Sequence, residues 1–339
     1  MSTQNVDIKQ IAKLPSIKSW KSTELAQRMA FRLFSNLKHG ELILRDGEQV
    51  FRFGGNDLSV APSVTVTIHH PRAYSRIIMG GTIGAGEAYI DGDWSTEQLT
   101  DVTRVFSANM PLLEAMKDQQ NWLVKATLKL AHSARRNSLT GSRENIAAHY
   151  DLGNDFFSLF LDPTLMYSSA VFPEGCNNLN EASQHKLRLI CEDLELKPTD
   201  HLIEIGTGWG GMAIFAAENY GCKVTTTTIS REQLEHAQKE VNARGLEDKI
   251  TLLFEDYRDL KGSFDKLVSI EMIEAVGHEY FDTYFSCVSK LLKPHGRAVI
   301  QAITINKQRY DEYRRSVDFI KRYIFPGGCL PPLDVITSA

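Results

Sequence analysis

The sequence predicts an α/β fold in which a parallel sheet carries helices on both faces, preceded by a small α+β domain. Three observations support the predicted sheet. The apolar run His201–Ile205 has the length and the branched aliphatic side chains of a buried strand. The following segment Met212–Asn219 has apolar residues at helical spacing. Glycines stand between them at positions 206, 208, 210 and 211, and α/β sheets bind nucleotides at turns of this kind.

The glycine loop fits two ligand classes differently. Gly206, Gly208 and Gly211 satisfy G-x-G-x-x-G, which for a dinucleotide predicts an acid about 20 residues later, at the end of the second strand. That strand, Cys222–Ile229, ends in threonines instead. Glu204 stands two positions before the first glycine, so the loop is similar to the E/D-x-G-x-G of methyltransferases that bind S-adenosylmethionine. A turn that binds no ligand is the remaining alternative, and the glycine density disfavours it.

The leading region predicts a small α+β domain that contacts lipid or forms a homodimer. An amphipathic helix is expected at Ser22–Leu37, facing either the core or a lipid surface. Short strands bounded by turn residues are expected at Glu41–Arg45, Val50–Phe53 and Val64–Ile68. The glycine-rich segment Met79–Asp93 matches neither a P-loop nor an EF-hand. We therefore expect tight packing between turns in this segment.

The chain divides into three expected parts: an N-terminal domain at residues 1–110, a helical and polar linker at 111–143, and a second domain at 144–339. Helical spacing extends over about Thr100–Leu130. The segment His132–Arg143 is polar and contains Ser, Asn and Gly, which is typical of an exposed linker. The second domain holds the glycine loop.

Composition excludes several classes of protein. With 339 residues, of which 42% are hydrophobic and 24% charged, the chain is an ordinary globular protein. Its net charge of -4 provides no overall basic field, so we expect no nucleic-acid partner. The 5 cysteines are widely spaced without C-x-x-C, so neither a disulfide framework nor a metal site is expected. Because no apolar run approaches a membrane span, we expect a cytoplasmic protein that is peripheral at the inner face of the membrane.

A series of motifs in one order carries a resemblance to a known family. The motifs are HYDLGNDFF, LDPTLMYSSAVF, EIGTGWGG, TTISREQ, EDYRDL, SIEMIEAVGHEYFDTYF and YIFPGGCLP. From about Ala147 to Pro331 they resemble the cyclopropane fatty acid synthase and mycolic acid methyltransferase family. The resemblance implies the Rossmann-like sheet of class I methyltransferases. It also implies methyl transfer from S-adenosylmethionine to the double bond of an unsaturated phospholipid acyl chain, giving a cyclopropane or a methyl-branched chain.

The resemblance assigns the cofactor contacts to residues in four segments. They are Tyr167, Ser168, Gly206, Gly208, Gly210, Thr228, Ile229, Gln233, Asp256 and Tyr257. A hydroxyl at Thr228 and an amide at Gln233 take the place of the usual ribose-binding acid, which explains why the second strand ends in threonine. Asp256 and Tyr257 would flank the adenine, since a tyrosine ring stacks on a purine.

The family also holds a bicarbonate ion as the base, and here two of its ligands differ. The resemblance assigns Glu274 and the backbone of Ile303 to this site, but Ser169 stands where the family has a cysteine and Gln301 where it has a histidine. Serine and glutamine can still donate hydrogen bonds to an anion. The site is therefore either a remodelled bicarbonate site or one that directs the reaction to another product. His149 begins the first motif and is a candidate gate of the cofactor pocket.

The end of the chain also departs from the family pattern. In the sheet order 3-2-1-4-5-7-6, a strand at Arg297–Ile303 would have a further neighbour, and the family continues with two more strands and a helical cap. We therefore expect a shortened protein with an unpaired strand edge. The basic residues that follow are candidates for contact with anionic head groups. They are Lys307, Arg309, Arg314, Arg315, Lys321 and Arg322.

Two alternatives to the lipid methyltransferase remain open. One is a small-molecule N-methyltransferase, which would need an amine pocket in place of an apolar channel. The leading domain and the motif HYDLGNDFF argue against it. The other is a non-catalytic lipid- or cofactor-binding relative, which the shortened end, Ser169 and Gln301 make a real alternative.

Overall fold

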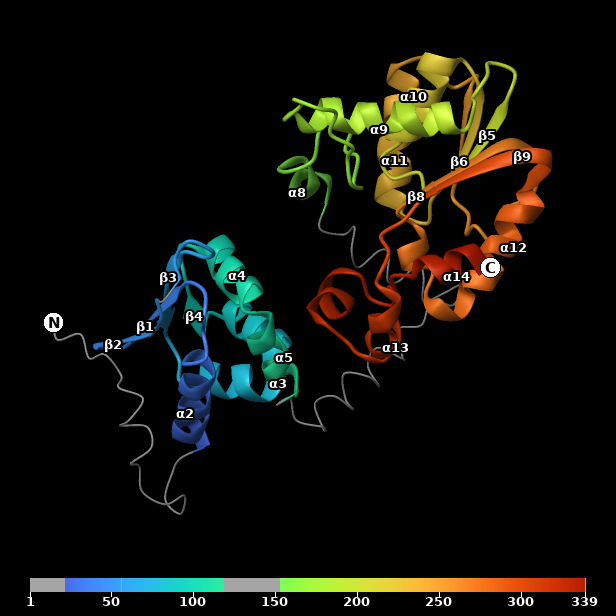
Figure 1. Ribbon diagram of the computed structural model, residues 1–339. Helices are drawn as coiled ribbons and strands as arrows, with labels where there is room; N and C mark the ends of the chain where they lie inside the picture. Colours follow the sequence, from blue (N-terminus) through green and yellow to red (C-terminus); the bar gives the residue numbers. More distant parts are fainter. Residues whose placement is uncertain (1–21, 56, 119–152, 339) are drawn as a thin grey trace. The chain divides into compact units, whose positions relative to one another are not determined.

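The computed structural model describes residues 22–55, 57–118 and 153–338 (Figure 1). The chain divides into two compact units, residues 1–130 and 131–339. The expected linker at His132–Arg143 and the candidate His149 lie outside the described residues. Among the residues described, no helix is both long enough and apolar enough to cross a membrane.

The first unit is a small sheet covered by helices, in the strand order β2-β1-β3-β4. The strands are β1 (Glu41–Asp46), β2 (Gln49–Gly54), β3 (Ser63–Ile68) and β4 (Trp94–Ser95). The helices are α2 (Ser22–Phe34), α3 (Arg72–Ile90), α4 (Leu99–Ala108) and α5 (Met110–Asp118). Strands β1 and β2 form an antiparallel hairpin, whereas β1 and β3 pair in parallel. The predicted helix and strands at the start of the chain are thus present.

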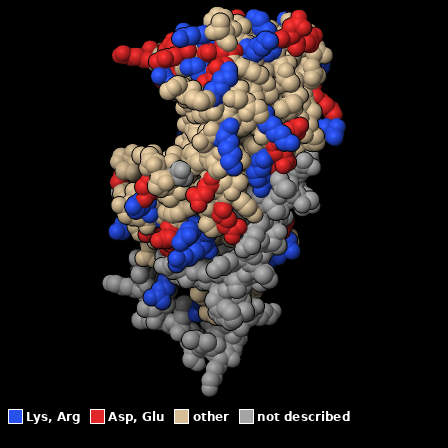
Figure 2. All heavy atoms as spheres, turned by 90° about the vertical axis from the view of Figure 1, so that its right-hand side faces the viewer, with Lys and Arg blue, Asp and Glu red and all other residues tan. Residues whose placement is uncertain are grey.

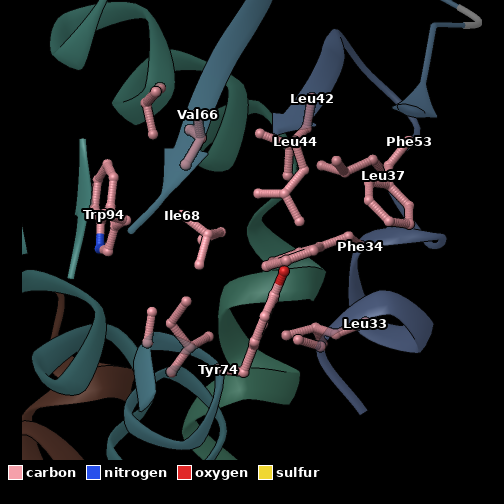
Figure 3. Packing of buried hydrophobic residues seen from close by; sticks show 14 of the residues in the cluster. Leu33, Phe34, Leu37, Leu42, Leu44, Phe53, Val66, Ile68, Tyr74 and Trp94 are labelled. Carbon is pink, nitrogen blue, oxygen red and sulfur yellow. The ribbon is translucent and has the colours of Figure 1, made fainter. Parts of the chain in front are cut away.

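The core of the first unit lies between the helices and one face of this sheet (Figure 3). Leu33 and Phe34 of α2 are buried with Leu42 and Leu44 of β1. Tyr74 of α3 is also buried, and its hydroxyl donates a 2.8 Å hydrogen bond to Asp46. Helix α2 therefore packs on the core through its apolar face, as the core-facing alternative expects.

The glycine-rich segment Met79–Asp93 was expected to form turns, and this expectation is wrong. Most of the segment is helical, as the second part of α3, with a break at Gly81 where φ is 59°. At Gly84 a Cβ atom would lie 2.1 Å from the carbonyl oxygen of Arg76, so only glycine permits this close approach. Asp93 is fully buried and pairs with Arg72 at 2.6 Å and Arg76 at 3.2 Å, so this acid is structural.

The second unit contains a parallel sheet in the order β7-β6-β5-β8-β9 (Figure 1). Its strands are β5 (His201–Ile205), β6 (Lys223–Thr227), β7 (Ile250–Leu253), β8 (Phe264–Ile270) and β9 (Leu292–Gln301). In chain order within this unit the arrangement is 3-2-1-4-5, as predicted. Among the described residues β9 pairs with β8 alone, so β9 forms an edge of this sheet.

Helices cover both faces of this sheet, which confirms the Rossmann-like prediction. Helices α9 (Leu179–Asp193), α10 (Gly211–Tyr220) and α11 (Arg231–Ala243) share one core with Leu202 of β5. Helix α12 (Phe281–Leu291) shares the other core with Ile203 and Ile205. Successive residues of β5 thus enter opposite cores, since side chains alternate along a strand. The segments that remain are short: α8 (Asn154–Ser158), η2 (Ile273–Ala275), η3 (His278–Tyr280), α13 (Lys307–Arg315), η4 (Ile320–Ile324) and α14 (Leu333–Ser338).

Candidate cofactor site and the carboxylates beside it

The glycine loop joins β5 to α10 at the point where the strand order of the sheet reverses. Gly206, Gly208 and Gly210 all have positive φ, at 102°, 53° and 95°, which side chains other than glycine rarely adopt. The backbone nitrogen of Gly206 donates a 3.1 Å hydrogen bond to the carbonyl oxygen of Thr227 in the neighbouring strand. The loop thus exposes backbone at the carboxyl ends of two parallel strands, where open α/β sheets bind ligands.

A pocket at this edge is lined by all the predicted cofactor residues except Gly210. The lining residues among those predicted are Tyr167, Ser168, Gly206, Gly208, Thr228, Ile229, Gln233, Asp256 and Tyr257. Gly210 caps α10 instead, and a Cβ atom there would lie 3.2 Å from that of Ala237 in α11. Its glycine character therefore serves close packing of the two helices.

Aromatic packing and one hydrogen bond fix the first motif against the loop. The Tyr167 ring lies 5.2 Å from Phe157 and 6.4 Å from Trp209, between ring centroids. The indole nitrogen of Trp209 donates a 2.6 Å hydrogen bond to the side chain of Asn154. Asn154 and Phe157 of the first motif are thus in direct contact with Trp209 of the glycine loop, although 55 positions separate Asn154 from Trp209.

The second strand ends in a buried hydroxyl and amide, as the sequence suggests. The Thr228 hydroxyl donates to the side-chain oxygen of Gln233 at 3.0 Å. The hydroxyl of Ser230 caps α11 by accepting a hydrogen bond from the backbone nitrogen of Gln233 at 3.3 Å. Because the amide oxygen of Gln233 is engaged, its amide nitrogen remains the group that can donate to a hydroxyl of a ligand.

Glu204 lies on β5, directly before the glycine loop, and no cation among the described residues pairs with it. Its side chain is 2% exposed, and it accepts a 2.6 Å hydrogen bond from the Thr226 hydroxyl. Burial raises the pKa of Glu204 to about 8. The acid of the E-x-G-x-G motif is therefore mainly protonated at neutral pH in the free protein.

At the other end of the pocket, Asp256 is held by Arg258, a residue that the motif did not single out. The guanidinium donates to both carboxylate oxygens, at 2.8 Å and 2.7 Å, while the carboxylate is 2% exposed. The same guanidinium lies 5.4 Å from the ring centroid of Tyr257. Burial raises the pKa of Tyr257 to about 12, so its ring remains neutral. Arg258 thereby orients both residues assigned to the adenine.

A buried lysine contacts Ser168, one of the residues that line the pocket. Lys186 of α9 is 2% exposed, and its ammonium group donates a 2.5 Å hydrogen bond to the hydroxyl of Ser168. Burial lowers the pKa of Lys186 to about 8, against the opposing effect of Glu271 and Asp162. In the sequence this lysine is one of many charged residues on an amphipathic helix, so no pattern predicted that it would lie at the pocket.

The two residues that depart from the family pattern meet at a third residue, Glu271, which sequence reasoning missed. The backbone nitrogen of Ser169 donates to Oε1 of Glu271 at 2.8 Å, and the amide of Gln301 donates to the same oxygen at 2.7 Å. Gln301 also lies 3.1 Å from the hydroxyl of Ser169. Glu271 directly follows β8, has a φ of 48°, and lines the cofactor pocket.

Glu274 and Ile303 are also in contact, and they lie close in the sequence to Glu271 and Gln301 respectively. The backbone nitrogen of Ile303 donates to Oε1 of Glu274. Among the described residues no partner reaches the buried Oε2, and burial raises the pKa of Glu274. The carbonyl oxygen of Glu274 accepts a 2.8 Å hydrogen bond from Cys329, which anchors the segment near the chain end.

Comparison with known proteins agrees with the geometry of the pocket. A family model described as mycolic acid cyclopropane synthetase matches residues 137–339. The cyclopropane-fatty-acyl-phospholipid synthase of Escherichia coli K12 is 39% identical over 81% of this chain and 69% of its own length. A tuberculostearic acid methyltransferase of Mycobacterium tuberculosis is 38% identical over 81% of this chain and 65% of its own. The chain thus spans about two thirds of the length of these relatives.

Solved structures support the same assignment. The cyclopropane synthase MmaA2 from Mycobacterium tuberculosis superposes with a TM-score of 0.54 at 31% identity, covering 58% of this chain and 72% of that one. The mycolic acid cyclopropane synthase CmaA1, complexed with SAH and CTAB, has a TM-score of 0.54 at 34% identity, with the same coverage of each chain. The chain belongs to the mycolic acid cyclopropane synthetase family, and it is a methyltransferase whose cofactor is S-adenosylmethionine.

Proposed function

We propose that the chain transfers the methyl group of S-adenosylmethionine to the double bond of an unsaturated acyl chain in a membrane phospholipid. The product is a cyclopropane or a methyl-branched acyl chain. The observation that carries this proposal is the likeness to the phospholipid synthase, which includes the leading region as well as the methyltransferase domain. We retain the division into a leading domain at 1–110, a linker at 111–143 and a methyltransferase domain at 144–339 as part of this proposal.

Different pocket residues would hold different parts of the cofactor. Tyr257 and Asp256 would hold the adenine, and Thr228 with Gln233 would hold the ribose hydroxyls. The wall formed by Tyr167 and Ser168 is then left for the methionine end of the cofactor. When bound, S-adenosylmethionine supplies an electrophilic methyl group on a sulfonium. The role of the chain is to orient the alkene towards that methyl group.

Apolar residues on the pocket wall suit a reaction that passes through a carbocation. Leu165, Met166, Met272 and Val276 line the pocket between the cofactor residues. Such side chains exclude water, which would otherwise capture the cation as an alcohol. Met166 therefore lines the pocket, whereas Phe172 is 51% exposed and does not line it.

We propose peripheral contact with the membrane through exposed apolar side chains near the first motif. Leu159 is 80% exposed, and Phe156, Phe160 and Phe172 are also exposed. These residues flank the segment that forms the Tyr167 wall of the pocket, so a bound bilayer would lie near the entry of an acyl chain. Exposed apolar side chains of this size favour insertion at a lipid interface.

Both lysines among the basic residues near the chain end interact with other groups of the protein. Lys321 is buried, lies 3.5 Å from the ring centroid of Tyr313, and donates to the carbonyl oxygens of Tyr313 and Ser316. Lys307 pairs with Asp334 at 2.6 Å. On the face drawn in Figure 2, basic and acidic side chains are interspersed among the described residues. Exposed Arg309 and Arg315 remain candidates, each contributing about 1 kcal/mol at an anionic surface.

The experiment is incubation of the purified chain with radiolabelled S-adenosylmethionine and vesicles of unsaturated phospholipid. The acyl chains are then released as methyl esters and identified by gas chromatography and mass spectrometry. Label in the acyl chains supports the proposal, and the fragmentation pattern distinguishes a ring from a branch. Cofactor binding without labelled lipid would favour the non-catalytic alternative, and label transferred only to a small amine would favour the N-methyltransferase.

A further inference from the structure

We infer that the carboxylate of Glu271 accepts the proton released in the reaction, in the place that the family resemblance gives to a bicarbonate ion. This inference rests on the proposed function, because it concerns the proton lost after methyl transfer to an alkene. It is carried by the contacts of Glu271 and by its position on the wall of the cofactor pocket.

Donors that could bind an anion at this position already bind a carboxylate of the protein. The amide of Gln301 and the backbone nitrogen of Ser169 both donate to Oε1 of Glu271, and the hydroxyl oxygen of Ser169 accepts a hydrogen bond from the same amide. The backbone nitrogen of Ile303 donates to Glu274. Hydrogen bonds from N–H groups to a carboxylate are among the stronger ones in proteins. A bicarbonate ion would therefore have to displace a carboxylate that is covalently part of the chain.

The charges around the site also disfavour a further anion. Glu271 and Glu274 influence each other electrostatically, and the presence of Glu271 contributes to the raised pKa of Glu274. The Lys186 ammonium and the Tyr167 hydroxyl also interact with Glu271. Because Lys186 already interacts with two acids, Glu271 and Asp162, a bicarbonate ion would be a third anionic group beside one cation.

The geometry leaves one oxygen of Glu271 available for a proton. Both hydrogen bonds described for this carboxylate end on Oε1, and none of the described residues is shown donating to Oε2. The backbone of Glu271 is held as well, because its nitrogen donates to the carbonyl oxygen of Gln301 at 2.8 Å. Its φ of 48° is unfavourable for a residue with a side chain, and such strain concentrates at functional sites.

Glu271 lies at the edge of the sheet formed by the carboxyl ends of the strands, where the cofactor pocket also lies. It follows β8, the strand that pairs with β5, so it projects from the same edge as the glycine loop. A Cβ atom on Gly206 would lie 3.3 Å from the side chain of the next residue, Met272. Ser168 and Tyr167, assigned to the methionine end of the cofactor, line the pocket with Glu271. The carboxylate is therefore on the same wall as the residues nearest the reacting methyl group.

The proposed step balances in atoms and electrons. One alkene carbon forms a bond to the sulfonium methyl carbon as the bond from sulfur to that carbon breaks, leaving neutral S-adenosylhomocysteine and a cation at the other alkene carbon. A C–H electron pair of the new methyl group then closes the ring at the cationic carbon. The proton passes to Oε2 of Glu271 and from there to solvent.

The test is turnover on unsaturated phospholipid vesicles in buffer depleted of carbon dioxide, with and without added bicarbonate. We expect the native chain to be active without bicarbonate and unchanged by it. Glu271→Gln keeps the size of the side chain but cannot accept the proton, so turnover should fall by at least about 100-fold. Its affinity for S-adenosylhomocysteine should stay within about threefold of native, and Glu247→Gln, an exposed site, should behave as native.

A second variant separates chemistry from folding. Glu271→Ala opens space for a small carboxylate, so formate should restore part of its turnover. The inference is overturned if bicarbonate stimulates the native chain, if Glu271→Gln retains turnover within threefold, or if both variants lose cofactor affinity together with activity. A native chain that labels no acyl chain under any condition contradicts the proposed function instead, so the two failures are distinguishable.

Discussion

The ammonium group of Lys186 donates a 2.5 Å hydrogen bond to the hydroxyl oxygen of Ser168, from a position that is almost fully buried. Because that oxygen is used as an acceptor, the hydroxyl hydrogen of Ser168 is free to point into the pocket. We therefore expect Lys186 to orient Ser168 as a donor towards the carboxylate at the methionine end of the cofactor.

Lys186→Met should weaken the binding of S-adenosylhomocysteine by about tenfold, which corresponds to about 1.4 kcal/mol. Binding of 5′-methylthioadenosine, which has no carboxylate, should be unchanged, since the adenine and ribose contacts remain. Isothermal titration calorimetry of both ligands measures the difference. Ser168→Ala should have a similar effect, and the double variant should be little worse than either single one. Equal losses for both ligands would instead indicate a structural role for Lys186.

Affinity for S-adenosylhomocysteine should also depend on pH through Lys186. Its pKa is about 8 in the free protein, so the charged form that attracts a carboxylate is lost as pH rises through that value. We expect affinity to fall between pH 7 and pH 9 more steeply for the native chain than for Lys186→Met. The variant is the control for titration of the amino group of the ligand, because that titration affects binding to both proteins equally. Parallel pH profiles would contradict the prediction.

Glu204→Gln should change how stability depends on pH. Burial raises the pKa of Glu204 from 4.5 to about 8, so the folded state keeps a proton that the unfolded chain releases above its own pKa. The contribution of Glu204 to stability is therefore full below about pH 4.5 and declines as pH rises towards 8. Glutamine does not titrate, so the variant should gain a few kcal/mol relative to native between pH 5 and pH 8. Urea unfolding at several pH values measures this gain.

Arg258→Ala should leave the carboxylate of Asp256 buried without its cation. Breaking a buried pair in this way costs about 3 kcal/mol or more of unfolding free energy. The double variant Arg258→Met with Asp256→Asn should recover part of the loss, because it removes both charges. Arg244→Ala is the matched control, since its pairs with Glu218 and Glu240 are exposed and worth less than about 1 kcal/mol. Equal losses in Arg258→Ala and Arg244→Ala would refute the prediction.

Gly84→Ala and Gly80→Ala should have opposite effects, although both lie in α3. A Cβ atom at Gly84 would lie 2.1 Å from the carbonyl oxygen of Arg76, so the backbone must shift and we expect a loss of about 3 kcal/mol. At Gly80 a Cβ atom meets nothing within 4 Å, so alanine should stabilise the helix by about 0.5 to 1 kcal/mol. Thermal unfolding of the two variants tests the contrast.

Local patterns in the sequence were enough to predict the sheet. The bounds of β5 agree with the predicted strand, because an apolar run followed directly by glycines has few other structures available. The cofactor residues from Tyr167 to Tyr257 were assigned by motif, and they line one pocket apart from Gly210. Helix α3 was missed because its glycines lower helix propensity, while their value in close packing depends on contacts that the sequence does not display.

The carboxylate cluster was predicted only in part, for a related reason. Ser169 and Gln301 were noticed because they depart from a motif, but the residue that joins them was not. Their side chains are 132 positions apart, and Glu271 lies between them in the chain without any local pattern. Lys186 and Arg258 were missed in the same way. An isolated charged residue has no periodicity, so its partner becomes visible only when the chain is folded.

The pairing of Gln301 with Glu271 has a consequence for local unfolding. Gln301 ends β9, and within the described residues that strand is held by β8 alone, with Ile270 opposite Gln301 in the register. When the end of an edge strand frays, its amide hydrogens exchange with solvent well before the rest of the sheet opens. Each such opening would also release the carboxylate of Glu271 from one of its two donors. Hydrogen exchange at the end of β9 would therefore report how often the carboxylate of Glu271 loses the Gln301 donor.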